Sequence, residues 1–344
     1  MSISRINKNA LFSALSLHIV VLICWVAYTF YQPKLFMDFG FEDLSIQYEN
    51  IQKILLVLIP PIAGFIADKY FGKKEKLLLF MLVSLMITAC IFLASAGIFI
   101  NKSNPLIQYV PVFMILWVIG MNIFYSPGLN IISQSAAQTG WSFASAVTGA
   151  ATDIVLAIVP LLLIFFDTIG SVITFMLGGL LLILVSYLYF KSHQKSIVLS
   201  EHLRSKFPFF NIGQALLIGI CLGFIHHHIL HEIKFDLIKL DHELVISILM
   251  LFSAAIIIYN HNKMHKYGYV RLFIIGFVLC LLAYLLVHNF NETAFQFIAC
   301  IIMVGGLVGV TGCAFAASLE KVNPFWSNTA TGFILCGFNL MALF

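Results

Sequence analysis

One acidic residue, Asp153, stands in the middle of a long apolar stretch, halfway between Gly140 and Phe166. A charged carboxyl group at the centre of a bilayer costs at least ~2.5–3.5 kcal/mol, so such a group normally faces a cavity or a partner. Ser145 and Gly149 precede it at four-residue intervals and extend it into a polar stripe on one helix face. Asp153 is therefore a candidate proton carrier. The alternative is a protonated carboxyl group that only bonds a neighbouring helix.

His18 is the second candidate for proton chemistry, because it also lies within an apolar stretch. Trp25 follows two turns later on the same helix face, and Tyr28 lies close to it. An intramembrane imidazole relays protons or binds a ligand, or it is a neutral side chain bonded to a backbone carbonyl. The sequence leaves both interpretations of His18 open.

Polar side chains recur every four residues in another apolar stretch, at Asn122, Ser126 and Asn130. This spacing places the three side chains on one face of a helix. That face points either into a central cavity or toward the second helix of the chain, and we favour the cavity.

The segment from His226 to Glu232 is rich in histidine. His227 and His231 are four residues apart, which places two imidazoles on one helix face, as a metal site requires. The sequence has no second histidine cluster, and this one falls at the end of an apolar stretch. We therefore predict a titratable rim near the mouth of a helix bundle and no metal, with a metal site as the alternative.

The composition determines the class of protein that holds these groups. Of 344 residues, 61% are hydrophobic and only 10% are charged, and the mean hydropathy is +1.01. A soluble chain carries about 45–50% apolar and about 25% charged residues. A soluble enzyme, a nucleic-acid-binding protein and a disordered chain are thereby excluded, and we predict an all-α polytopic membrane protein. The seven cysteines form no Cys-x-x-Cys pair, so we expect no disulfide framework, zinc site or cofactor.

Eleven apolar stretches approach the roughly 20 residues that a helix needs to cross a bilayer. They lack the alternation of barrel strands, so we predict transmembrane helices. The first stretch has no clear cleavage site, and we expect it to be retained. The predicted spans are 11–31, 51–67, 77–100, 109–131, 141–166, 171–190, 209–230, 244–259, 272–288, 295–317 and 330–344.

The charges between these spans alternate in sign along the chain. Most of the 19 basic residues lie in alternate connections, such as 69–76 and 191–206, and most of the 15 acidic residues lie in the other connections. The positive-inside rule then predicts a cytoplasmic N-terminus and a multi-pass protein of the inner or plasma membrane.

The chain also divides into two halves. A long polar segment at 191–208 separates a six-helix bundle at 1–190 from a second bundle at 209–344 that holds the last five spans. Gly72 and Gly268 stand at corresponding places in the two halves, each between two spans. Paired halves of this kind are typical of secondary transporters.

The segment 64–74, GFIADKYFGKK, resembles the loop 2–3 signature of the major facilitator superfamily. A second copy at 263–271 keeps Gly268 and the basic residues but has Met264 where the aspartate would stand. The resemblance implies two six-helix bundles, and the twelfth helix is missing or truncated in this sequence.

In that family the signature acts as a conformational latch between the halves. The resemblance assigns this role to Gly64, Asp68, Gly72, Lys73 and Lys74. The alternative is that the basic residues only fix the topology.

The resemblance also implies a secondary active transporter that works by alternating access and has no enzymatic activity. We expect proton coupling, with Asp153 and His18 as the proton-carrying groups. No lysine or arginine lies in the middle of a predicted span, so we expect a neutral polar substrate, sugar- or nucleoside-like, or an amphiphilic, weakly cationic compound. The predicted substrate path is lined by Trp25, Tyr28, Asn122, Tyr125 and Gln214.

The expected partners are the small-molecule substrate, protons and the lipid bilayer, without nucleic acid, and we expect a monomer. Two other classes of protein stay open. One is a metal-dependent integral membrane enzyme that uses the cluster from His226 to Glu232. The other is a receptor or assembly subunit that does not transport.

Overall fold

The computed structural model describes residues 8–70, 74–101, 105–135, 137–194, 206–233, 241–290 and 292–344. Within these ranges the regular structure is helical and no strand occurs, as predicted. The long helices are α1 (Lys8–Asp38), α2 (Ser45–Tyr70), α3 (Lys74–Phe99), α4 (Val110–Ser135), α5 (Ala137–Ala157), α6 (Val159–Gln194), α7 (Phe209–Phe224), α9 (His242–Tyr267), α10 (Tyr269–Asn289), α11 (Thr293–Leu319) and α12 (Ser327–Leu340).

Most of these helices are long and apolar enough to cross a bilayer. In the described residues, nine helical segments meet both criteria. A helix satisfies its own backbone hydrogen bonds, which is what allows such an apolar chain to enter lipid. The predicted fold class, an all-α polytopic membrane protein with about eleven helices, is confirmed.

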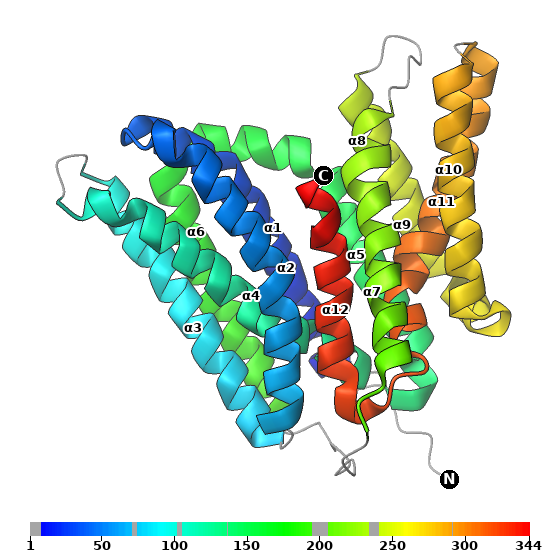
Figure 1. Ribbon diagram of the computed structural model, residues 1–344, viewed down its shortest axis with the longest axis horizontal. Coiled ribbons are helices and arrows are strands. Elements are labelled where there is room, and N and C mark those ends of the chain that lie inside the picture. Colours follow the sequence, from blue (N-terminus) through cyan, green and yellow to red (C-terminus); the bar gives the residue numbers. More distant parts are fainter. Residues whose placement is uncertain are drawn as a thin grey trace.

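The boundary between α5 and α6 differs from the boundary predicted between the fifth and sixth spans. The expected span 141–166 ends early, because α5 stops at Ala157 and α6 begins at Val159. Pro160 stands at this break, where it cannot donate a backbone hydrogen bond. The chain then turns at Gly170, whose φ of 80° suits a residue without a side chain. In Figure 1 the part of α6 before this turn lies across the top of the view.

The helices form two groups that lean apart toward the upper end of Figure 1. In the first group, α1 and α3 pack against α4 and α6, and α2 packs against α4. In the second group, α11 packs against α7, α9 and α10, and α7 packs against α12. The predicted boundaries, 1–190, 191–208 and 209–344, stay a prediction, because residues 195–205 lie outside the described ranges.

The groups meet in two places. α12 crosses to pack against α2 and α4 of the first group, and α5, which also contacts α1 and α4, packs against α9 and α11 of the second group. Small residues of α5, including Ala146, Ala150 and Ala157, belong to the same apolar core as the second group. Any motion of one group against the other must therefore change the α2–α12 contact and the contacts of α5.

Candidate functional site

The first cluster of polar contacts between the groups surrounds Asp68, near the end of α2. Its Oδ1 accepts hydrogen bonds from the backbone nitrogen (3.2 Å) and the Nδ2 (2.7 Å) of Asn328. Its Oδ2 accepts from the backbone nitrogen (2.7 Å) and the Oγ1 (2.6 Å) of Thr329. Asp68 is buried, and its hydrogen-bond partners among the described residues lie in the first turn of α12.

The first turn of α12 needs such a partner. The opening N–H groups of a helix have no acceptor within the helix, and the helix dipole favours a negative charge there. Trp326 stands at the capping position of α12 and supplies no side-chain hydrogen bond. Asp68 therefore acts as the cap of a helix that belongs to the other group.

The polar stripe of α4 lies against the same turn. The Oγ of Ser126 donates to the carbonyl of Asn328 at 2.7 Å. The Nδ2 of Asn130 lies 2.8 Å from the Oγ of Ser327 and 2.9 Å from the Oδ1 of Asn328. Asn122, the third member of the stripe, donates to Val118 of its own helix at 2.8 Å. Two of these three side chains thus contact α12 instead of lining a cavity or facing α2.

Gly64, the first predicted latch residue, lies where α2 and α12 approach most closely. A Cβ atom at Gly64 would lie 2.3 Å from the carbonyl oxygen of Asn328, so only glycine fits. Gly72 and Lys73 lie outside the described residues, and so does the side chain of Lys74. The described part of the predicted latch is therefore Gly64 and Asp68.

The second polar cluster between the groups surrounds Asp153 on α5. Its Oδ2 accepts a hydrogen bond from the Oγ of Ser253 on α9 (2.9 Å) and lies 3.0 Å from the Oγ1 of Thr311 on α11, whose single hydroxyl proton also reaches the carbonyl oxygen of Leu307 at 2.7 Å. Its Oδ1 has no hydrogen-bond partner among the described residues, and the side chain is 0% exposed. The carboxyl group thus lies inside the contact between the two groups.

The rest of the predicted α5 stripe meets α11 in the same contact. The Oγ of Ser145 donates to the carbonyl of Gly312 at 3.1 Å and accepts from the backbone nitrogen of Ala316 at 3.3 Å. A Cβ atom at Gly149 would lie 2.4 Å from the carbonyl oxygen of Thr311. Small and polar residues on one face of α5 therefore let the two backbones touch.

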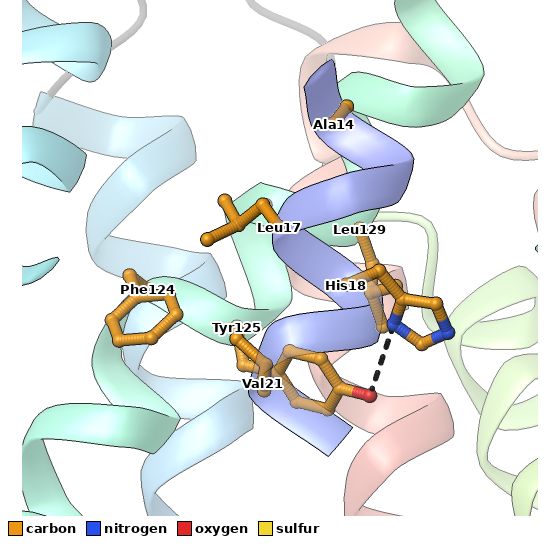
Figure 2. A pocket seen from close by; sticks show the side chains of 8 residues that line it. Ala14, Leu17, His18, Val21, Phe124, Tyr125 and Leu129 are labelled. Atoms are coloured by element: carbon orange, nitrogen blue, oxygen red, sulfur yellow. Dashed lines mark hydrogen bonds between the residues drawn. The ribbon is translucent and has the colours of Figure 1, made fainter. Parts of the chain in front are cut away.

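His18 lies on the other side of α5, beside a small pocket between α1 and α4 (Figure 2). Its Nε2 is 2.9 Å from the Oγ1 of Thr152, the residue before Asp153. Its Nδ1 is 3.4 Å from the hydroxyl of Tyr125, the contact drawn dashed in Figure 2. The cavity volume is about 10 Å³. Room for one water molecule is about that size, so this state holds no organic solute there.

The predicted substrate-path residues do not meet at one place in this state. Tyr125 lines the pocket, but Tyr28 is fully buried, with its hydroxyl bonded to that of Tyr48. Trp25 packs edge-on against Tyr28. Gln214 on α7 donates to the carbonyl of Ala317 at 3.3 Å. Their role as substrate contacts stays a prediction.

The histidine segment forms a π-helical turn, Ile225–Ile229, followed by the short helix α8 (Leu230–Glu232). The Nε2 of His228 is 3.1 Å from the carbonyl oxygen of Met341, and the rings of His226 and His227 lie against Phe338. Glu232 accepts from the hydroxyl of Tyr284 at 3.0 Å. The described residues contain no group of three or more histidine, cysteine or acidic side chains that could hold a metal ion.

Sequence reasoning missed four residues that hold the two carboxyl groups. Asn328 and Thr329 bind Asp68, and Ser253 and Thr311 bind Asp153. The run Ser-Asn-Thr at 327–329 was a usable signal, because these residue types favour the start of a helix. Ser253 and Thr311 are single hydroxyl residues in apolar stretches and carry no comparable signal.

Comparisons with known proteins agree with this architecture. The family model described as Major Facilitator Superfamily matches residues 54–344. No curated protein matches the chain. The human organic anion transporter MFSD10 has a similar structure, with a TM-score of 0.70, 12% sequence identity, and coverage of 97% of this chain and 91% of that chain.

Two other solved structures have similar folds. A bacterial homologue of the iron transporter ferroportin, in an outward-facing state, gives a TM-score of 0.69 and 13% identity, and covers 98% of this chain and 90% of its own. The E. coli fucose:proton symporter FucP gives 0.66 and 10% identity, with the same two coverages, 98% and 90%. Similarity at these identities is evidence of a shared fold.

Proposed function

The chain belongs to the major facilitator superfamily, and on this premise we propose that it is a secondary active transporter that moves a small organic solute by alternating access. The family and the structural neighbours indicate a transporter and not an enzyme. The observation that carries the mechanism is the capping of α12 by Asp68. This contact joins the two groups at one end and can form or break as a unit, as the switching element of a rocking transporter requires.

The lower end in Figure 1, where α2 ends and α12 begins, is the cytoplasmic end in this proposal. Basic residues concentrate in the connections predicted to lie on that side, including 69–76 and 191–206. The described state is then closed toward the cytoplasm, in an inner or plasma membrane. We propose that the monomer performs the full cycle and needs no cofactor.

Proton coupling is the second part of the proposal, with Asp153 as the proton-carrying residue and His18 as its relay. Asp153 is a buried acid in the contact that must change during the cycle. His18 reaches the neighbouring residue, Thr152, from the side of the pocket. FucP, which shares the fold, is a fucose:proton symporter, and this supports the same driving force here.

The polar groups beside the pocket support one substrate class over another. His18 and Tyr125 are its polar lining residues, and they are suited to hydrogen bonding with hydroxyl or amide groups. No lysine or arginine lines it, so a multiply anionic substrate would lack a fixed counter-charge. We propose a neutral polar solute, sugar- or nucleoside-like, with an amphiphilic weak cation as the second candidate.

Flux in proteoliposomes tests this function. A thermal-shift screen of purified protein against sugars, nucleosides and amphiphilic amines first identifies a ligand, and uptake of that ligand is then measured with and without an imposed pH gradient. Gradient-driven accumulation supports proton coupling. Uptake that ignores the gradient indicates a facilitator, and binding without uptake indicates a receptor.

Asp153→Asn is expected to remove gradient-driven accumulation, because asparagine keeps the shape of the side chain but carries no exchangeable acid proton. We expect accumulation to fall roughly tenfold, to the level without a gradient, which corresponds to ~1.4 kcal/mol of lost driving force. Exchange of labelled for unlabelled substrate should continue. Asp167→Asn is the matched control. Asp167 is the next acidic residue along the chain, and its side chain is exposed and paired with Lys34. Unchanged accumulation in Asp153→Asn would rule out this residue as the proton carrier.

A further inference from the structure

Two hydroxyl groups of the second helix group lie at the carboxyl group of Asp153 on α5, the helix that packs against both groups. We infer that Ser253 and Thr311 are positioning residues that make the α5 contact sensitive to the charge of Asp153, so that the contact holds on the neutral acid and parts on the charged one. This inference rests on the proposed function, since it names the residues through which the proposed proton carrier acts on the helices.

The carboxyl group of Asp153 has too few hydrogen-bond partners to satisfy its charged form. An ionised carboxylate offers about four acceptor sites. Here the hydroxyl groups of Ser253 and Thr311 both lie at Oδ2, the Thr311 hydroxyl is shared with the carbonyl oxygen of Leu307 at 2.7 Å, and Oδ1 has no partner among the described residues. A buried charge with incomplete hydrogen bonding is costly, whereas a water-filled gap would satisfy every site. The closed contact therefore suits the neutral acid better than the charged one.

The backbones of α5 and α11 approach each other closely beside Asp153. Gly149, one turn before Asp153, lies so near α11 that a Cβ atom there would be 2.4 Å from the carbonyl of Thr311. Because the two backbones already touch beside Thr311, any separation of α11 from α5 directly lengthens the 3.0 Å contact between the Thr311 hydroxyl and Oδ2. Separation of the helices and loss of this hydrogen bond are thus one event.

The surroundings contain few other groups that titrate. On α10, the thiol of Cys280 is within electrostatic range of Asp153. On α1, His18 contacts the adjacent Thr152, and on α9, His261 lies against Phe143 of α5. α11 presents the hydroxyl of Thr311 and no ionisable partner among the described residues. Asp153 is therefore the acid whose charge the contact must accommodate.

Hydrogen–deuterium exchange on the purified full chain, without substrate, tests the inference. Exchange of the α5 and α11 backbone amides is compared at mildly acidic and mildly alkaline pH, after correction for the intrinsic pH dependence of exchange. We expect faster exchange at alkaline pH in the native protein. We expect no pH difference in Asp153→Asn, because the side chain stays neutral.

Thr311→Val separates a positioning role from a purely structural one. Valine keeps the shape of threonine and removes one of the two hydroxyl groups at Oδ2 of Asp153. Exchange should rise roughly tenfold at alkaline pH, because a hydrogen bond to a charged group is lost, and much less at acidic pH. Thr311→Ser keeps a hydroxyl group and should show native exchange at both pH values. Ser253→Ala should raise exchange at alkaline pH as Thr311→Val does. The double variant of Asp153→Asn with Thr311→Val should show the same exchange at both pH values.

Two results would overturn the inference. One is an equal rise in exchange at both pH values in Thr311→Val, which is the mark of a structural contact only. The other is a pH difference that persists in Asp153→Asn. Because exchange requires no substrate, proton-driven flux with pH-independent exchange rejects this inference alone, and Asp153-dependent exchange without flux rejects the transport function alone.

Discussion

Asp68→Asn is expected to slow transport by roughly 30-fold to several thousand-fold, since removing one partner of a buried charged contact costs ~2–5 kcal/mol. The amide nitrogen of asparagine cannot accept a hydrogen bond, so it would face the backbone N–H or the hydroxyl of Thr329 without forming the native bonds. The negative charge at the start of α12 is lost as well. The state that joins α2 to α12 then becomes too rare to support the cycle.

Two measurements on this variant report on different steps. Substrate flux in proteoliposomes gives the functional loss, and exchange of the amide hydrogens of Asn328 and Thr329 reports on the contact itself. Thr329→Val removes only the 2.6 Å hydroxyl bond and leaves both backbone bonds, so its effect should be clearly smaller. Slow exchange at both amides in Asp68→Asn, together with native flux, would show that Asp68 is not the latch.

Gly64→Ala and Gly332→Ala are each expected to weaken the same contact through overlap of atoms. A Cβ atom would lie 2.3 Å from the carbonyl of Asn328 in the first variant and 2.3 Å from the carbonyl of Pro60 in the second. Overpacking of this kind costs ~1–3 kcal/mol, which shifts the balance between states by about 5-fold to about 150-fold. Flux should fall by a similar factor, and the first turn of α12 should exchange faster.

The control for added volume lies on α3. A Cβ atom at Gly97 would have nothing within 4 Å, so Gly97→Ala adds the same methyl group to a helix without a clash. We expect native flux and native exchange from this variant. If Gly97→Ala impairs flux as much as Gly64→Ala, the loss comes from handling of the protein and not from the α2–α12 contact.

The sequence predicted the fold class and drew attention to two carboxyl groups that lie in contacts between helices distant in the chain. The apolar composition required membrane helices, and the 64–74 motif identified Gly64 and Asp68 as residues of a contact between the halves. The cost of a charge in lipid required a partner for Asp153, and the structure shows such a partner in Ser253 and another in Thr311. In each case the physical requirement was readable from local sequence.

The hydrogen-bond partners of Asp68 and Asp153 could not be predicted from the sequence, because they depend on how helices distant in the chain pack together. Asn328 and Thr329 lie about 260 positions from Asp68, and no periodicity connects the two segments. The predicted last span begins at residue 330, whereas α12 begins at Ser327 and the side chains of 327–329 are buried. Tyr28 shares a helix face with expected cavity-lining positions, but helical spacing does not tell which neighbour covers that face.

The end of α5 was also hidden from the sequence. Apolar residues continue on both sides of Pro160, so hydropathy alone predicted a single span where the backbone forms the end of α5 and the start of α6. A proline within a helical stretch can kink a helix or end it, and the neighbouring packing decides which. The fold of the chain is thus far more predictable than the places where its helices change direction.

The capping of α12 by a residue of α2 also constrains biosynthesis. The ribosome makes Asp68 long before Asn328 and Thr329, the residues that complete its coordination. Through most of translation this acid has no native ligand, and the newly inserted bundle must keep it hydrated or shielded by the insertion machinery. Completion of this contact therefore waits for α12, and a nascent chain interrupted before residue 327 lacks the groups that bind the Asp68 carboxylate.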